Sequence, residues 1–155
     1  SASDAAFAGG VDAALLMAEQ AKKAGININV VKEPNDSYWD NVWLKKDWCL
    51  CYWGGRPVAD MFLSVSLAAD AAWNDTHWKN PRFNELLLAA RAETDETKRA
   101  AQYAEAQQLV HDDGGQIVLM YNNFVGALNT GIGHNTLNSD FDHDGGYMYE
   151  RWWKA

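Results

Sequence analysis

The chain has few cysteines, few prolines and fewer basic than acidic residues, and it has no apolar run long enough to cross a membrane. Its 155 residues include 2 cysteines, 3 prolines, 13 Lys and Arg, and 21 Asp and Glu, for a formal net charge of -8. This balance argues against nucleic acid or an anionic membrane surface as the main partner, because phosphates require a basic surface. With 48% hydrophobic residues, the composition is typical of one globular domain.

Reactive groups are also sparse. The four histidines stand apart, and no Gly-x-Ser-x-Gly, His-Glu-x-x-His or P-loop pattern is present. Cys49 and Cys51 lie two apart in a predicted strand and are most simply interpreted as buried thiols, with redox or metal roles left open. The sequence therefore predicts no enzymatic activity and no cofactor, with a hydrolase that uses Cys51 or Asp75 as an alternative.

Hydrophobic periodicity predicts helices that alternate with strands. Helices are expected over residues 11–23, 37–46, 58–68 and 95–111, and another opens at Pro81 after the capping residue Asn80. Strands are expected over residues 26–30, 48–53, 117–121 and 124–128, and residues 69–80 are expected to form a loop. Strand, helix and strand with short links indicate an α/β domain with a right-handed crossover.

The loop after the predicted strand 48–53 is the candidate ligand site. Ligands bind outside the carboxyl ends of strands in open α/β sheets, and here the strand ends at Trp53, Gly54, Gly55 and Arg56. Glycines permit close backbone approach, tryptophan offers a flat apolar face and arginine offers a planar fork of donors. Trp73 and Asn122 are further candidates, although a structural turn or a core position would also explain these residues.

Several motifs, in order, resemble one receptor family. They are Tyr38-Trp39-Asp40-Asn41-Val42-Trp43, Trp53-Gly54-Gly55-Arg56-Pro57, Arg82-Phe83-Asn84-Glu85-Leu86-Leu87, Thr97-Lys98-Arg99, Tyr103-Ala104-Glu105-Ala106-Gln107 and the closing Glu150-Arg151-Trp152-Trp153. Together they resemble the C-terminal part of bacterial extracellular solute-binding proteins of the dipeptide, oligopeptide, nickel and opine class.

The resemblance implies a fold, a location and partners. It implies a lobe of the type II periplasmic-binding-protein fold, with a mixed sheet flanked by helices, over residues 1–130. Residues 131–155 would form a tail that crosses back to the N-terminal lobe of the same receptor. Such receptors are exported to the periplasm or cell exterior by a signal that we expect to lie outside this sequence. They close on a small-molecule or peptide ligand and deliver it to an ABC permease.

One departure from the family bears on the ligand. Peptide-binding relatives commonly have an aspartate three residues after the loop tryptophan, which binds the ammonium group of the peptide, and here that position is Arg56. A guanidinium repels an ammonium and pairs with a carboxylate or phosphate, so a solute with an anionic group is expected. Asp60 is the candidate to take over the role of the missing aspartate.

The tail carries the alternative hypothesis. Asp140, Asp142 and Asp144 alternate before Gly145, as in the first half of a calcium-binding loop. The twelfth position of that loop, where a bidentate glutamate belongs, is Arg151, and no flanking helices are predicted. These residues are therefore weak metal candidates, and the alternative is a calcium-stabilised interaction module that docks through its aromatic tail.

Overall fold

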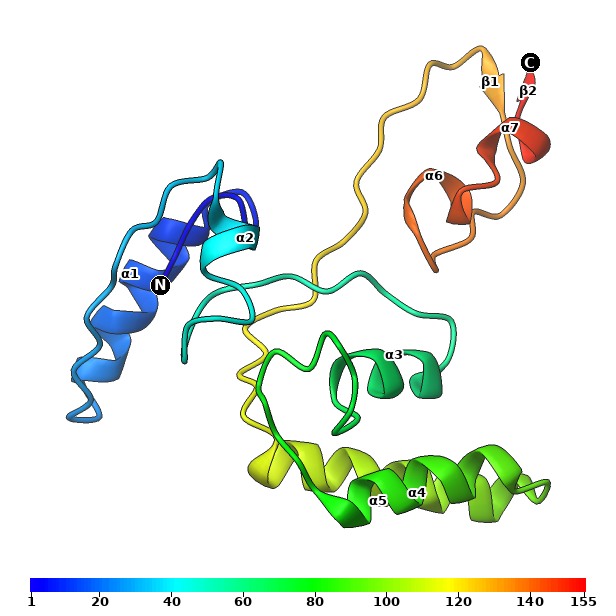
Figure 1. Ribbon diagram of the computed structural model, residues 1–155. Coiled ribbons are helices and arrows are strands. Elements are labelled where there is room, and N and C mark those ends of the chain that lie inside the picture. Colours follow the sequence, from blue (N-terminus) through cyan, green and yellow to red (C-terminus); the bar gives the residue numbers. More distant parts are fainter.

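The computed structural model describes residues 1–155 and is built mainly of helices joined by long extended segments (Figure 1). The longer helices are α1 (Gly10–Lys22), α3 (Ala59–Ser66), α4 (Pro81–Ala92) and α5 (Glu96–Asp113). Single-turn helices are α2 (Tyr38–Asn41), α6 (Asp142–Gly145) and α7 (Met148–Arg151), and the strands are β1 (Ile132–Gly133) and β2 (Trp153–Lys154). None of the helices combines the length and the apolar character that crossing a membrane requires.

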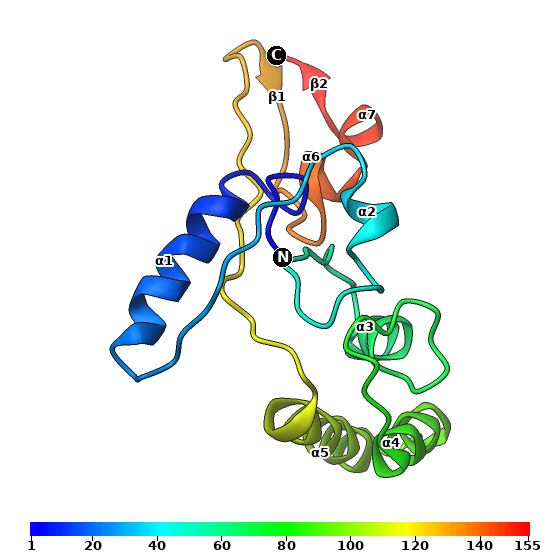
Figure 2. The ribbon, with the colours of Figure 1, turned by 60° about the vertical axis from the view of Figure 1, so that its left-hand side comes forward.

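The larger core lies between α3, α4 and α5, and α4 and α5 run side by side (Figure 2). The helix predicted to open at Pro81 is present as α4, and its apolar stripe is buried, with Phe83 at 0% and Leu86 at 2% exposure. The ends of these helices also follow the sequence signals. The Asn80 side chain accepts a hydrogen bond from the Phe83 backbone N–H, and Asp95 caps α5 in the same way.

The predicted helix 37–46 is wrong in extent, since α2 ends at Asn41. Tyr38 and Val42 are nevertheless buried in a second, small core with Ala6, whereas Trp39 is 37% exposed. The Tyr38 hydroxyl donates a hydrogen bond to the Leu50 carbonyl at 2.6 Å. This contact holds α2 against the extended segment that leads to the candidate ligand loop.

The predicted strands 26–30, 48–53, 117–121 and 124–128 do not form, so the mixed sheet is not confirmed. These segments are extended, but a strand needs a hydrogen-bonded neighbour, and most of them have none. The only sheet is the two-stranded antiparallel pair of β1 and β2, in which Ile132 pairs with Lys154. A continuous apolar run indicates burial but does not supply the partner strand.

The tail, which carries β1, α6, α7 and β2, follows the long extended segment after α5 (Figure 1). Within the tail, Asp144 is the central polar group. Its carboxylate accepts hydrogen bonds from the Asn138 backbone at 2.6 Å and the Trp152 indole at 3.2 Å, and it forms an ion pair with Arg151 at 3.1 Å. Buried Asp144 thereby joins the segment before α6 to the end of α7.

Candidate functional site

Asp75 is the acceptor at the centre of a cluster of tryptophans. Its Oδ2 atom accepts hydrogen bonds from the indole nitrogens of Trp43 at 3.1 Å and Trp53 at 3.0 Å. The Cys51 thiol approaches the same oxygen at 3.4 Å, and the Gln116 amide lies 3.5 Å from Oδ1. Indole N–H groups that are partly buried need an acceptor, and a carboxylate is a strong one. Four residues from three separate segments thus converge on one side chain.

The tryptophan rings pack around this carboxylate. The ring centroids of Trp43, Trp53 and Trp73 are mutually 6.2 to 6.4 Å apart with tilted or edge-on planes. Phe62 of α3 packs edge-on against Trp53 at 5.5 Å. Such arrangements stabilise aromatic pairs beyond the area that they bury. The cluster is an aromatic wall that joins α3 to the segments before and after it.

Trp73 is the part of this wall that faces solvent, with 47% of its surface exposed. A shallow hollow opens beside it, lined by Ser64 and Val65 of α3 and by Ala71, Ala72 and Trp73. Because the lining is almost entirely apolar, this hollow suits an apolar group of a ligand. The polar lining residue, Ser64, is already hydrogen-bonded to Asp60 and Arg91, so Asp75, two residues after Trp73, is the candidate polar anchor for such a ligand.

The environment of Asp75 also suppresses the reactivity of the nearby thiol. Burial, followed by the charge of Asp75 and its hydrogen bond, raises the pKa of Cys51 to about 12. Burial and the same charge raise the pKa of Cys49. A thiol with such a pKa stays protonated at neutral pH and is a poor nucleophile, which argues against a hydrolase built on Cys51.

In the predicted ligand loop, Arg56 folds back onto its own backbone. One guanidinium nitrogen, Nη1, donates to the carbonyl of Gly54 at 2.9 Å and to that of Gly55 at 3.0 Å. The Nε and Nη2 groups make no hydrogen bond within the chain and are free to bind an anion. At Gly55, a Cβ would lie 3.4 Å from the Asp140 carbonyl, so the loop and the tail approach closely.

The structure brings only part of the predicted set together. Trp53 and Trp73 meet in the aromatic cluster, and Gly54, Gly55 and Arg56 follow directly after it. Asp60 lies on α3, where its carboxylate pairs with Arg91 of α4 at 2.9 Å. Asn122 is exposed in the extended segment after α5 and makes no hydrogen bond within the chain.

The weak metal candidates do not converge. No group of three or more His, Cys, Asp or Glu side chains is arranged to hold a metal ion. The Asp144 carboxylate is already engaged by its three donors, whereas Asp142 approaches only His143, at 3.5 Å. A cation at Asp144 would have to compete with the ion pair to Arg151.

Sequence reasoning missed Asp75 as a site residue and considered it only as a possible hydrolase group. Trp43 also belongs to the cluster. Asp75 is 32 residues from Trp43 and 22 from Trp53, so no local spacing reports their contact. The available signal was the density of tryptophans in the loop 69–80, which holds Trp73, Asp75 and Trp78.

Comparisons with known proteins identify relatives over more than half of the chain. It is 30% identical over 122 residues to a probable D,D-dipeptide-binding periplasmic protein of Escherichia coli, covering 75% of the chain and 23% of that protein. It is 32% identical over 93 residues to a probable deoxycholate-binding periplasmic protein of E. coli, covering 60% of the chain and 16% of that protein. An oligopeptide-binding protein of Bacillus subtilis is 34% identical over 94 residues, which is 56% of the chain and 17% of that protein.

The chain thus spans about one fifth of the length of these curated relatives. No family model matches it, and no solved structure gives a significant match. The similarity to extracellular solute-binding proteins that the motifs predicted is confirmed, and four of the relatives are named as periplasmic.

Proposed function

We propose that this chain forms a ligand-binding lobe of a periplasmic or extracellular receptor for an ABC importer, and that it captures a peptide-like or other small solute. The observation that carries the proposal is the aromatic wall on Asp75, with Trp73 open to solvent beside an apolar hollow. The relatives are named as binding proteins for oligopeptides, a D,D-dipeptide and deoxycholate, and these names support a binding role rather than catalysis.

In this proposal the ligand lies against Trp73 and meets charges of both signs. Asp75 supplies a carboxylate for a cationic group, and its Oδ1 atom has only the long contact to Gln116. Arg56 supplies two N–H donor positions of its guanidinium, Nε and Nη2, for an anionic group of the ligand. A zwitterionic solute such as a short peptide matches this pair of charges, and apolar solutes use mainly the hollow.

The remainder of the receptor architecture is part of the same proposal. Residues 1–130 form the lobe, residues 131–155 reach toward an N-terminal lobe, and closure of the two lobes presents the solute to a membrane permease. Because one lobe supplies only one wall of the site, we expect this chain alone to bind weakly, on the order of millimolar.

Tryptophan fluorescence of the 155-residue chain, titrated with trialanine and with deoxycholate, tests the proposal. We expect saturable binding of at least one probe that Trp73→Ala weakens several-fold. Trp153→Ala is the matched control, because Trp153 is also half exposed, at 49%, but lies in β2. If neither probe binds, or if the two variants bind equally well, the proposed site is wrong.

The charge of the ligand is tested separately with Arg56→Gln. Replacing the guanidinium is expected to weaken trialanine, which has a carboxylate, more than trialanine amide, which has none. Equal effects on the two peptides would refute the role of Arg56 in binding an anionic group. This result would not affect the proposal that the ligand binds against the aromatic wall.

A further inference from the structure

Asn74 lies in the loop between α3 and α4, between the two site residues Trp73 and Asp75. Asn74 is buried, at 5% exposure, whereas Trp73 is 47% exposed. The Nδ2 group of Asn74 donates hydrogen bonds to the Trp78 carbonyl at 2.7 Å and to the Ala68 carbonyl at 3.3 Å. Because these carbonyls lie near the two ends of the loop, one buried side chain ties both ends together.

The other groups of Asn74 are bonded within the same loop. The Thr76 hydroxyl donates to its Oδ1 atom at 3.1 Å, and the His77 N–H donates to its backbone carbonyl at 3.2 Å. His77 has a φ of 54°, in the left-handed region that is unfavourable for a residue with a Cβ. Such a conformation persists only where the surrounding contacts hold it, and the bond from Asn74 to the carbonyl of the next residue, Trp78, is one of these contacts.

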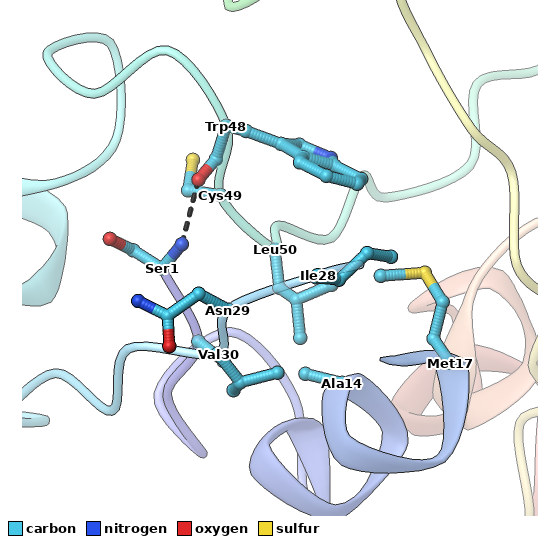
Figure 3. Close-up of a pocket in the computed structure, with 10 residues that line it drawn as sticks. Ser1, Ala14, Met17, Ile28, Asn29, Val30, Trp48, Cys49 and Leu50 are labelled. Atoms are coloured by element: carbon cyan, nitrogen blue, oxygen red, sulfur yellow. Dashed lines mark hydrogen bonds between the residues drawn. The ribbon is translucent and has the colours of Figure 1, made fainter. Parts of the chain in front are cut away.

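The indole donors to Asp75 are held by contacts outside this loop. Trp53 follows Leu50, whose side chain faces Ala14 of α1 across an apolar hollow (Figure 3). The Leu50 carbonyl accepts a hydrogen bond from the Tyr38 hydroxyl of α2 at 2.6 Å. The donor side of the site is thus fixed by α1 and α2, and the position of the acceptor depends on the loop that carries Asp75.

We infer that Asn74 is a positioning residue of the proposed solute site. By closing the loop, it holds Asp75 against the indole donors and Trp73 beside the apolar hollow before a ligand arrives. A site that is ordered in advance loses less conformational entropy when it binds, so this hold raises the affinity although Asn74 itself is buried away from the ligand. The effect on affinity rests on the proposed function, whereas the hold on Asp75 does not.

The first test is NMR of the indole N–H groups in the ligand-free 155-residue chain with Asn74→Ala. We expect the signals of Trp43 and Trp53 to move upfield, because their indoles lose a charged acceptor, and their hydrogen exchange to become at least about tenfold faster. The indole of Trp152, which donates to Asp144 in the tail at 3.2 Å, is the internal reference, and its signal should stay in place.

Three further variants separate positioning from a general loss of stability. Asn74→Asp keeps the size of the side chain but replaces the Nδ2 donor, so it should shift the two signals as Asn74→Ala does. Asp95→Ala removes the cap of α5, which lowers stability without touching the loop, and should leave both signals in place. Thr76→Val removes only the hydroxyl that bonds Asn74, and it should give a smaller shift in the same direction even if the Asn74 variants do not fold.

Titration with trialanine and with deoxycholate then tests the effect on binding. Asn74→Ala should weaken whichever probe binds the unmodified chain at least about fivefold, and Asp95→Ala less than about twofold. If neither probe binds the unmodified chain, the proposed function fails, and the indole signals still decide whether Asn74 holds Asp75. Unchanged signals of Trp43 and Trp53 in the folded variants, equal movement in Asp95→Ala, or full affinity in Asn74→Ala would overturn the inference.

Discussion

Replacing Asp75 by asparagine should weaken the hydrogen bonds that hold the aromatic wall, because the amide has the same shape as the carboxylate but no charge. The Oδ2 atom of Asp75 accepts hydrogen bonds from Trp43 and Trp53, at 3.1 and 3.0 Å. A hydrogen bond to a charged group contributes about 1.5–3 kcal/mol and a neutral one about 0.5–1.5 kcal/mol, so the amide loses about 1 kcal/mol for each indole. Because the cluster is only partly buried, solvent reduces this loss, and we expect a total of about 1–2 kcal/mol.

Thermal unfolding followed by circular dichroism measures this effect. For a chain of this length, a loss of about 1–2 kcal/mol lowers the melting temperature by about 2–8 °C. Asp70→Asn is the matched control, since Asp70 is exposed and accepts no hydrogen bond, and its effect should stay below about 0.5 kcal/mol.

The Cys51 thiol gives a second, independent readout. Removing the charge of Asp75 removes the second cause of the raised pKa of Cys51, so its alkylation by iodoacetamide should become faster at pH 9–10. The experiment is performed with Cys49→Ser to leave one thiol. If Asp75→Asn melts like Asp70→Asn and the alkylation rate does not change, the geometry around Asp75 is wrong.

Three further perturbations test other parts of the structure. Phe83→Ala should lower the free energy of unfolding, measured with denaturant, by about 3–5 kcal/mol because Phe83 is fully buried. The control Leu88→Ala, at a site with 66% exposure, should lower it by less than about 1 kcal/mol. Similar losses for the two variants would refute the packing of α4. The raised pKa of Cys51 contributes stability that is fully present below the ordinary thiol pKa and is lost as the pH rises from about 9 to 12. Cys51→Ala should therefore reduce the loss of folding stability over this pH range. An unchanged loss would contradict the raised pKa. Asp144→Asn should weaken the ion pair to Arg151 and increase proteolysis within the tail, unlike the control Asp142→Asn, and equal cleavage would refute the central role of Asp144.

The helices were predictable because their signals are local. The spacing of Phe83, Leu86 and Leu87 fixes the buried face of α4, and the side chains of Asn80 and Asp95 satisfy the first N–H groups of the helices that follow them. The pair Gly114-Gly115 ends α5, with Gly115 at a φ of +74°. All of these features depend on contacts within a few residues along the chain.

The strands and the centre of the site were not predictable in the same way. The uncharged segment 48–53 is typical of a buried strand, yet Tyr52 is 62% exposed and the segment does not form a strand. Whether an apolar segment becomes a strand depends on a distant partner, which local composition does not report. The contact of Asp75 with Trp43 and Trp53 is long-range for the same reason.

The most direct test of the account is an NMR titration of the indole N–H signals of the 155-residue chain with trialanine and with deoxycholate. We expect the signals of Trp53 and Trp73 to shift progressively and saturate with at least one probe, while that of Trp153 stays in place. Shifts confined to Trp153, or no saturable shift of Trp53 and Trp73 with either probe, would contradict the claim that the aromatic wall on Asp75 binds the solute.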